Sequence, residues 1–156
     1  MAQIAQGQIK INLPINTVYS FIANLENMVY FWPKIKKVEK DPDSPDAVGP
    51  GTKYFIYSNT ILGGRKKAVF ELNDSTAHNH FEYRDSSGIL TGFYFSEEPD
   101  GTMIQMYRKT EFGTLASLLT LNLVSSRDAK NEIEKALLRL KTFLEAENFT
   151  APPEED

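Results

Sequence analysis

The feature that most constrains the fold is a long amphipathic helix near the end of the chain. Segment 127–147, RDAKNEIEKALLRLKTFLEAE, carries an apolar stripe at helical spacing, made of Ile133, Ala136, Leu137, Leu140 and Leu144. On the more polar side, Glu132 precedes Lys135 by three residues, and Lys141 precedes Glu145 by four. The segment therefore predicts one long helix that buries a single face.

The start of this helix has two interpretations. Ser125 and Asp128 have the spacing of a capping box, which would place the start there. Alternatively, the helix begins near Leu115 and carries a kink. The apolar run 115–124 includes Thr120 and Asn122 and is far too short to span a bilayer.

Five strand-like runs precede the helix, at 53–59, 66–73, 80–84, 90–97 and 102–112. Turn-forming residues separate them, at 63–64, 73–75, 85–88 and 99–101. Connections this short predict antiparallel hairpins. Segment 41–52, DPDSPDAVGPGT, is dense in Asp, Pro and Gly and predicts a loop.

The N-terminal region predicts a strand followed by two short helices. Apolar residues alternate with polar ones at 9–13, as in a half-buried strand, and Pro14 then opens a helix. The apolar face of that helix consists of Val18, Phe21, Ile22 and Leu25. A second helix is expected at roughly 26–32, ended by Pro33.

This order of elements predicts an α+β fold. An antiparallel sheet of about six or seven strands with one apolar face would curl around the C-terminal helix. A sheet curled around one helix rarely closes completely, so the space between them is expected to form a cavity. The two short helices would close or gate one end.

Length and composition limit the class of protein. The chain has 156 residues, 41% of them hydrophobic, which fits one domain over 1–148 with an acidic, disordered tail at 149–156. A net charge of −4 argues against a general nucleic-acid binder. The absence of cysteine excludes disulfides and thiolate metal sites, and no signal peptide is evident. We therefore expect a cytoplasmic protein.

Several motifs, in order, resemble one superfamily. They are INLPINTVYSFIANLENMVYFWPKIKKVEK at 11–40, VGPGTKYFIY at 48–57, PDGTMIQM at 99–106 and LLRLKTFLEAE at 137–147. Together they resemble the START-like (SRPBCC) helix-grip superfamily, particularly its polyketide cyclase/dehydrase-like branch. The resemblance implies a cavity for a hydrophobic ligand but no particular reaction, because the superfamily includes carriers, cyclases and chaperone-activating domains.

The stretch NLENMVYFWPKIKKVEK, residues 24–40, has three interpretations. Phe31 and Trp32 could pack as core residues, or they could line or cap the mouth of the cavity with Lys34, Lys36 and Lys37 facing solvent outside it. The third interpretation is transient contact with a membrane surface, since aromatics beside lysines suit anionic lipids.

The resemblance and the strand pattern suggest which residues line the cavity: Phe31, Trp32, Tyr54, Phe70, Tyr83, Phe93, Phe95, Met106, Arg108, Leu137 and Leu140. Arg108 is the preferred polar ligand contact, because it shares the more apolar face of its strand with Ile104 and Met106. In the strand 53–59, the pattern does not decide whether Tyr54 and Ile56 or Phe55 and Tyr57 point inward. A packed core without a sizeable cavity is the alternative.

Evidence for catalysis is weak. The two histidines are expected in a hairpin loop (His78) and at a strand start facing solvent (His80), and most strand glutamates are expected to face water. His80 and Arg108 remain weak catalytic candidates, and no metal site or cofactor is expected. The leading hypothesis is a non-enzymatic carrier, monomeric or homodimeric, for a lipid, isoprenoid, quinone or polyketide-like aromatic molecule. A polyketide cyclase/dehydrase-like enzyme is the alternative, and a chaperone-activator-type interaction module is the second.

Overall fold

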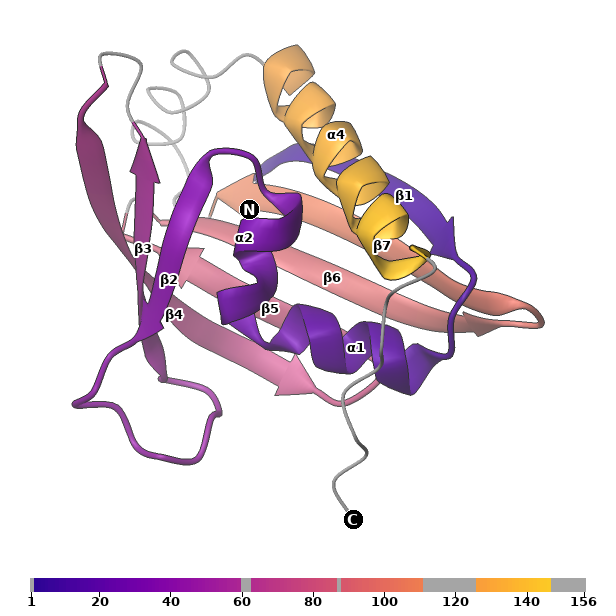
Figure 1. Cartoon of the computed structure of the whole chain (residues 1–156), viewed down its shortest axis with the longest axis horizontal. Helices are drawn as coiled ribbons and strands as arrows, with labels where there is room; N and C mark the ends of the chain where they lie inside the picture. The colour runs from indigo at the N-terminus through magenta and orange to yellow at the C-terminus, as the bar shows by residue number, and fades with distance from the viewer. Residues whose placement is uncertain (1, 60–62, 87, 111–125, 147–156) are drawn as a thin grey trace.

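A computed structural model describes residues 2–59, 63–86, 88–110 and 126–146, and shows seven strands, three short helical segments and one long helix (Figure 1). In chain order these are β1 (Ala2–Ile11), α1 (Ile15–Ala23), the 3₁₀ turn η1 (Leu25–Asn27), α2 (Met28–Phe31), β2 (Ile35–Lys40), β3 (Lys53–Asn59), β4 (Arg65–Thr76), β5 (His80–Asp85), β6 (Ile89–Glu98), β7 (Gly101–Thr110) and α4 (Ser126–Leu144).

The seven strands form one antiparallel sheet in the order β1-β7-β6-β5-β4-β3-β2. The sheet bends so that its two ends face in different directions, with α4 across β1 and β7 and the shorter helices in front of the middle strands (Figure 1). Helices therefore cover one face, which we call the concave face. The predicted α+β helix-grip architecture is confirmed.

Gly7 in β1 lets α4 approach the sheet closely. A Cβ at this position would lie 3.0 Å from Ile133 Cγ2 and 3.4 Å from Leu137 Cδ1. Because the glycine leaves that space free, the apolar stripe of α4 packs directly against the β1 backbone. Ile133 and Leu137 are almost completely buried there.

The core fills the space between the concave face and the helices. Its largest fully buried side chains come from the sheet, α1, η1 and α4: Phe81, Phe93, Ile11, Ile22, Leu25, Leu72, Ile104, Met106, Ile133, Leu140, Leu144 and Val18. Along β5, β6 and β7, alternate residues point into this core, as strand geometry requires. Apolar burial of this extent is the main term that stabilises the fold.

The N-terminal helices follow the prediction with one change of geometry. Pro14 is the N-cap of α1, and the predicted apolar face of that helix is buried. The second helix, expected as one piece at 26–32, is divided into η1 and α2. The Asn24 side chain accepts a hydrogen bond from the Glu26 backbone N–H and so caps η1. Pro33 follows directly after the last residues of this region, as expected.

Three parts of the predicted strand pattern are wrong. The first strand, expected at 9–13, is β1 and spans Ala2–Ile11. Strand β2 was not anticipated as a separate run, because its sequence IKKVEK carries three lysines and only two apolar residues. Residues 73–75 were expected to form a turn, but β4 continues through them to Thr76 with a β-bulge between Leu72 and Asp74. The turn lies at 77–79, where His78 has a φ of 63°.

Helix α4 begins at Ser126, while Ser125 and Leu115, which carried the two predictions of its start, lie outside the described residues. Its C-terminal end is attached to the β1–α1 region. Lys141 Nζ lies 2.7 Å from Glu145 Oε1 and donates to the Lys10 carbonyl at 2.8 Å, while the Asn12 N–H donates to Glu145 at 2.8 Å.

The predicted tail at 149–156 also lies outside the described residues. Within the described ranges, no helix has the length and apolar character needed to cross a membrane.

Candidate functional site

A row of three polar side chains from neighbouring strands crosses the concave face, and we call it the polar row: Arg108, Thr91 and Tyr83. Arg108 of β7 is paired with Thr91 of β6, and Thr91 is paired with Tyr83 of β5. Thr91 is 5% exposed and Tyr83 4% exposed. A polar row at this depth is unusual for a sheet face lined mainly by apolar side chains, so it is the first place to look for a ligand contact.

The Tyr83 hydroxyl is held as a neutral hydrogen-bonding group. Burial raises the pKa of Tyr83, while the nearby Arg108 charge and a hydrogen bond with Thr91 act in the opposite direction without overcoming it. The ring stacks on Phe70 with centroids 4.9 Å apart. Tyr83 thus presents an aromatic surface and a hydroxyl of fixed position to the same space.

Arg108 is incompletely paired. Its Nη1 lies 3.6 Å from Glu132 Oε2 of α4, which is an ion pair without short hydrogen-bond geometry. Its Nε is buried and has no hydrogen-bond partner among the described residues. The side chain is 20% exposed. A guanidinium removed from water with a donor unsatisfied carries a free-energy cost that an acceptor oxygen from a ligand would offset.

Glu132 is shared between two cations from different elements. Its Oε1 accepts from Lys34 Nζ at 2.7 Å, and its Oε2 faces Arg108. Lys34 follows α2 by three residues, so this glutamate connects the α2 end, helix α4 and the polar row. The side chains of Lys34 and Glu132 are 71% and 33% exposed, which makes the link a weak one that can open.

The residues predicted to line the cavity all lie on the concave side or in the core beside it, but in different environments. Phe93 and Phe95 belong to the end of the core that α1 closes, where Tyr19 meets Phe95 at 5.0 Å between ring centroids. Phe31 is 3% exposed and packs near Phe21, which favours the core interpretation for Phe31. Trp32 and Phe70 are half-buried against the core, and Tyr54, Tyr83, Met106, Leu137 and Leu140 are buried. That these residues line a cavity stays a prediction.

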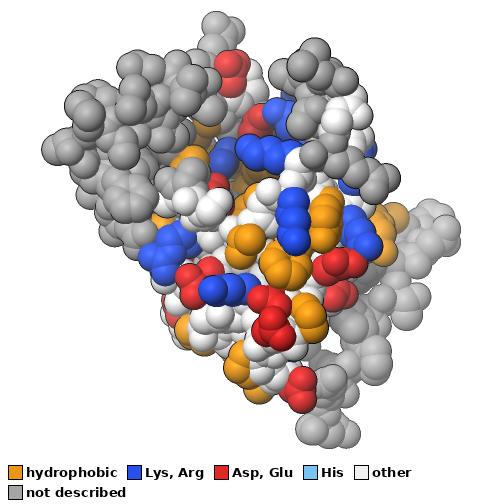
Figure 2. Space-filling model, turned by 90° about the vertical axis from the view of Figure 1, so that its left-hand side faces the viewer, with side chains coloured by type: hydrophobic (Ala, Val, Ile, Leu, Met, Phe, Trp, Pro, Cys, Tyr) orange, Lys and Arg blue, Asp and Glu red, His pale blue; other side chains and the backbone are white. Residues whose placement is uncertain are grey.

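The inward pair of β3 is Tyr54 and Ile56, so Phe55 and Tyr57 lie on the convex face. There Lys67 Nζ lies 4.1 Å from the centroid of the Phe55 ring, and Lys37 Nζ lies 5.8 Å from that of Tyr57. Lys37 of the basic stretch 34–37 and Lys67 of a second basic stretch, 65–67, thus come together across β3. Figure 2 shows hydrophobic side chains between basic and acidic ones on the side of the molecule where Figure 1 places β2, β3 and β4.

His80 does not belong to the polar row. It starts β5 as expected, but it lies on the convex face, and its side chain is only 15% exposed, so the expectation that it faces solvent is wrong. It contacts Asp74, Tyr107 and Tyr94. His78 lies in the hairpin loop as predicted. Among the described residues, no group of His, Asp and Glu has the arrangement of a metal site.

The glutamates on the strands differ in solvent exposure, and the alternation of apolar and polar residues did not predict this difference. Glu71 and Glu97 are partly or fully exposed, as expected, and Glu111 lies outside the described residues. Glu82 was expected in water but is 5% exposed on the convex face. The reason is local: Tyr107 lies over Gly92 and covers Glu82, to which its hydroxyl donates a hydrogen bond.

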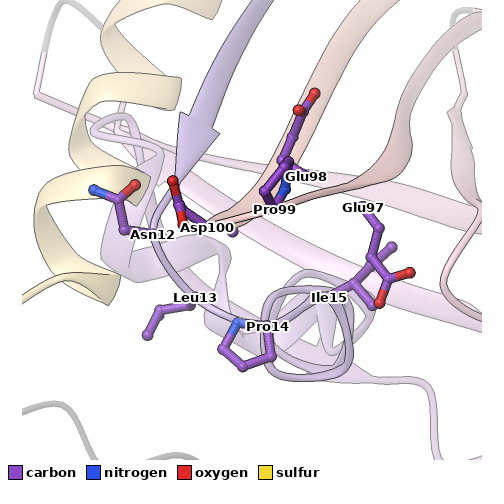
Figure 3. Close-up of a pocket in the computed structure, with 9 residues that line it drawn as sticks. Asn12, Leu13, Pro14, Ile15, Glu97, Glu98, Pro99 and Asp100 are labelled. Carbon is purple, nitrogen blue, oxygen red and sulfur yellow. The ribbon is translucent and has the colours of Figure 1, made fainter.

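A separate hollow of about 400 Å³ lies where the β1–α1 connection meets the β6–β7 hairpin. Its lining, drawn in Figure 3, consists of Asn12, Leu13, Pro14, Ile15, Glu97, Glu98, Pro99, Asp100 and Gly101. These residues come from two chain connections rather than from the concave face. The hollow therefore does not include the polar row.

Sequence reasoning found Arg108 and Tyr83 but missed Thr91 and Glu132. Thr91 shares the strand alternation of Phe93 and Phe95, which was the available signal that it points inward. Glu132 was interpreted as an i,i+3 partner of Lys135, although its recorded ion pairs cross to Lys34 and Arg108. Its position one residue before the stripe residue Ile133 was the available signal, because that edge of the helix borders the sheet.

No protein-family model matches the sequence, and a search among curated proteins finds no match. Solved structures are similar at the level of fold. A protein of Nitrosomonas europaea shares 10% identity over 92% of this chain and 94% of its own, with a TM-score of 0.67. The KanY protein, solved by NMR, shares 12% identity over 94% of this chain and 100% of its own, with a TM-score of 0.67.

A third similar structure is the di-domain ARO/CYC StfQ from the steffimycin biosynthetic pathway. It shares 10% identity over 91% of this chain and 50% of its own, with a TM-score of 0.63. At such identities the similarity concerns the fold alone. The sequence motifs, the strand order and these neighbours agree, and the chain has the START-like helix-grip fold.

Proposed function

We propose that this protein binds a small hydrophobic molecule between the concave face and α4, with an oxygen-bearing end of the ligand at the polar row. The observation that carries the proposal is the buried Nε of Arg108, which has no hydrogen-bond partner among the described residues and lies in a mainly apolar face. Most of the affinity would come from burial of apolar surface, at about 25 cal/mol per Å². The polar row would supply orientation.

The chemistry of the polar row selects the kind of oxygen. Arg108 has only donors, and its formal charge favours a carboxylate, a phenolate or a strongly polarised carbonyl. Tyr83 lies two residue pairs away across the sheet and can donate to a second oxygen. Aromatic and aliphatic acids, hydroxyquinones and polyketide-like phenols share this chemistry. An uncharged hydrocarbon or sterol ester would leave Arg108 unsatisfied.

The Glu132 link suggests how a ligand would enter. In the structure the Glu132 carboxylate lies beside Arg108, where the anionic group of a ligand would also bind. The same carboxylate pairs with Lys34, which follows α2. An entering anionic group would compete with Glu132 for Arg108, and release of Glu132 would weaken the Lys34 contact between α2 and α4. Binding and opening of the 26–33 region would thereby be linked.

An enzyme of the aromatase/cyclase type is the second candidate, supported by the fold neighbour StfQ, whose name carries ARO/CYC. Among the described residues of the concave face, the Arg108 guanidinium would stabilise an enolate in such a reaction, and the neutral Tyr83 hydroxyl would donate a proton. His80 lies on the opposite face and is not available there. A carrier requires only apolar burial and an orienting polar contact, whereas an enzyme also requires groups that act on the substrate. We therefore rank the carrier function first.

Native mass spectrometry of the protein purified from its own host, with organic extraction, tests this proposal. The wild type is compared with Arg108→Met and with the control Arg139→Met, which alters an exposed arginine of α4. We expect a co-purifying hydrophobic molecule with an acidic or carbonyl oxygen, retained in the control and reduced at least tenfold in Arg108→Met. Protein of apo mass in all three preparations, with no extractable ligand, would contradict the carrier function and direct attention to protein partners.

A further inference from the structure

The convex face carries a continuous chain of four titratable side chains, which we call the outer network: Asp74, His80, Tyr107 and Glu82. Asp74 Oδ2 lies 2.6 Å from His80 Nδ1, and His80 Nε2 lies 2.7 Å from the Tyr107 hydroxyl oxygen. The Tyr107 hydroxyl in turn contacts Glu82 Oε2. The chain joins β4, β5 and β7 across the strand order of the sheet.

Two local features of the sequence build this network. The bulge between Leu72 and Asp74 brings two consecutive side chains to the network, so that Asp74 contacts His80 and Asn73 Nδ2 donates to Glu82 Oε1. Gly92 provides the space for the Tyr107 ring, because a Cβ there would overlap the ring and hydroxyl. Tyr94 then stacks on the His80 ring at 4.5 Å between centroids and covers it.

The hydrogen bonds of the network require three hydrogens. One must lie between Asp74 and His80 Nδ1, one between His80 Nε2 and the Tyr107 oxygen, and one between that oxygen and Glu82. A neutral imidazole and a neutral phenol supply two hydrogens. Burial is the largest factor that raises the pKa of Tyr107, followed by Glu82, so the phenol keeps its own hydrogen. The third hydrogen must be an additional bound proton.

The surrounding charges indicate where that proton resides. Glu82 Oε2 lies 3.7 Å from Lys109 Nζ, and Asn73 donates to its other oxygen, so Glu82 has a cation and an amide donor beside it. A hydrogen bond with His80 holds the pKa of Asp74 below its ordinary value, so Asp74 is ionised. With the proton on His80, the four charged groups, Asp74, Glu82, His80 and Lys109, sum to zero.

We propose that the outer network is a proton-binding site that holds one proton, shared along His80, Tyr107 and Glu82, and that this proton fastens β4, β5 and β7 together. The shift is balanced: if Glu82 takes the hydrogen of Tyr107, Tyr107 takes that of His80 Nε2, and the network still contains three hydrogens. Loss of the proton leaves two acceptors facing each other across one of the contacts. The three strands then lose one charge-assisted hydrogen bond.

The position of the network gives this proton a consequence for the ligand, which rests on the proposed function. Tyr107, Glu82 and Gly92 each immediately precede or follow a member of the polar row on β7, β5 and β6. Glu82 and Tyr107 therefore lie on the opposite face of β5 and β7, directly behind Tyr83 and Arg108, and Asp74 extends the network to β4. Release of the proton is expected to loosen the spacing of these strands and to weaken ligand binding as pH rises.

NMR of the wild-type protein tests the proton without any variant. Nitrogen-15 shifts of both histidine rings and the carbon-13 shift of the Glu82 carboxyl are measured between pH 5 and 9. His78, exposed in its loop, is the internal reference, because these two are the only histidines. We expect that at pH 7.5 either His80 has both ring nitrogens protonated, or His80 is neutral and Glu82 is protonated.

An ionised Glu82 together with a neutral His80 at pH 7.5 would overturn the proposal. His80→Gln supplies a second readout, with His78→Gln as its control. Below pH 7, His80→Gln should be less stable than the wild type, and the difference should shrink as pH rises through the range where the NMR signals change. A stability difference that stays constant from pH 5 to 9 would also overturn it. Both results are independent of whether a ligand binds.

Discussion

Replacing Gly92 by alanine tests the packing of Tyr107 that builds the outer network. The new Cβ would clash with the Tyr107 hydroxyl and the ring carbon that bears it, and would lie 2.8 Å from Cε1. These atoms belong to a rigid ring whose hydroxyl contacts Glu82 and His80, so Tyr107 must leave its position. Overpacking of this kind costs about 1–3 kcal/mol.

Displacement of Tyr107 adds a second cost, because Glu82, 5% exposed, loses a charge-assisted hydrogen bond. An unsatisfied buried partner of this type costs about 1–3 kcal/mol. The expected loss in the free energy of unfolding is therefore about 2–6 kcal/mol, measured by urea denaturation at pH 7 with a fixed m-value. Gly49→Ala is the matched control, because a Cβ there meets nothing within 4 Å, and its effect should stay within about 0.5 kcal/mol.

A double-mutant cycle separates the clash from any general effect on the strand. In a Tyr107→Ala background the ring is absent, so adding Gly92→Ala should cost at least about 1 kcal/mol less than it does in the wild type. If Gly92→Ala has the same cost in both backgrounds, or no cost in the wild type, the packing of Tyr107 over Gly92 is not as described.

Three further predictions concern charge. Glu132→Gln removes the carboxylate that competes for Arg108, so an anionic ligand such as dodecanoate should bind about threefold to tenfold more tightly by calorimetry; weaker binding would show that Glu132 supports the ligand instead. Because burial and Glu82 raise the pKa of Tyr107 above that of an unfolded tyrosine, near 10, this residue stabilises the fold below pH 10 and loses that contribution above it. The free energy of unfolding should thus fall less steeply above pH 10 in Tyr107→Phe than in the wild type, and equal slopes would refute the assignment. If the lysines over Phe55 and Tyr57 meet a membrane surface, vesicles containing phosphatidylserine should retain the wild type more than the double variant Lys37→Glu/Lys67→Glu in a flotation assay, with Lys135→Glu as control, whereas equal retention of all three would exclude this surface.

Those parts of the fold that depend on periodicity were predictable from the sequence. Strand β3 was predicted with its observed bounds, and the stripe of α4 and the face of α1 are buried as expected. Strand β2 was missed because an edge strand needs only one row of apolar residues and tolerates lysine elsewhere. The bulge in β4 was missed because Asn73-Asp74-Ser75 is also an ordinary turn sequence.

The site was only partly predictable, for a different physical reason. Arg108 could be assigned to the inner face because Ile104 and Met106 share its alternation. The partners of Arg108 could not be assigned, since Thr91, Tyr83 and Glu132 are distant in sequence and meet only through strand register and helix docking. The same holds for the outer network, in which Asp74, His80 and Glu82 are close in sequence but Tyr107 arrives from another hairpin.

The most direct test of the proposed function is a comparison of ligands that differ only at their polar end. Binding of dodecanoate and dodecanol, and of 2-naphthoate and 2-naphthalenemethanol, is followed by Trp32 fluorescence and calorimetry in the wild type, Arg108→Met and Arg139→Met. We predict that the wild type and Arg139→Met prefer the acid of at least one pair by about tenfold or more, about 1.4 kcal/mol, and that Arg108→Met loses this preference while still binding the alcohol. An unchanged preference for the acid in Arg108→Met, or no binding of either member of both pairs to the wild type, would contradict it.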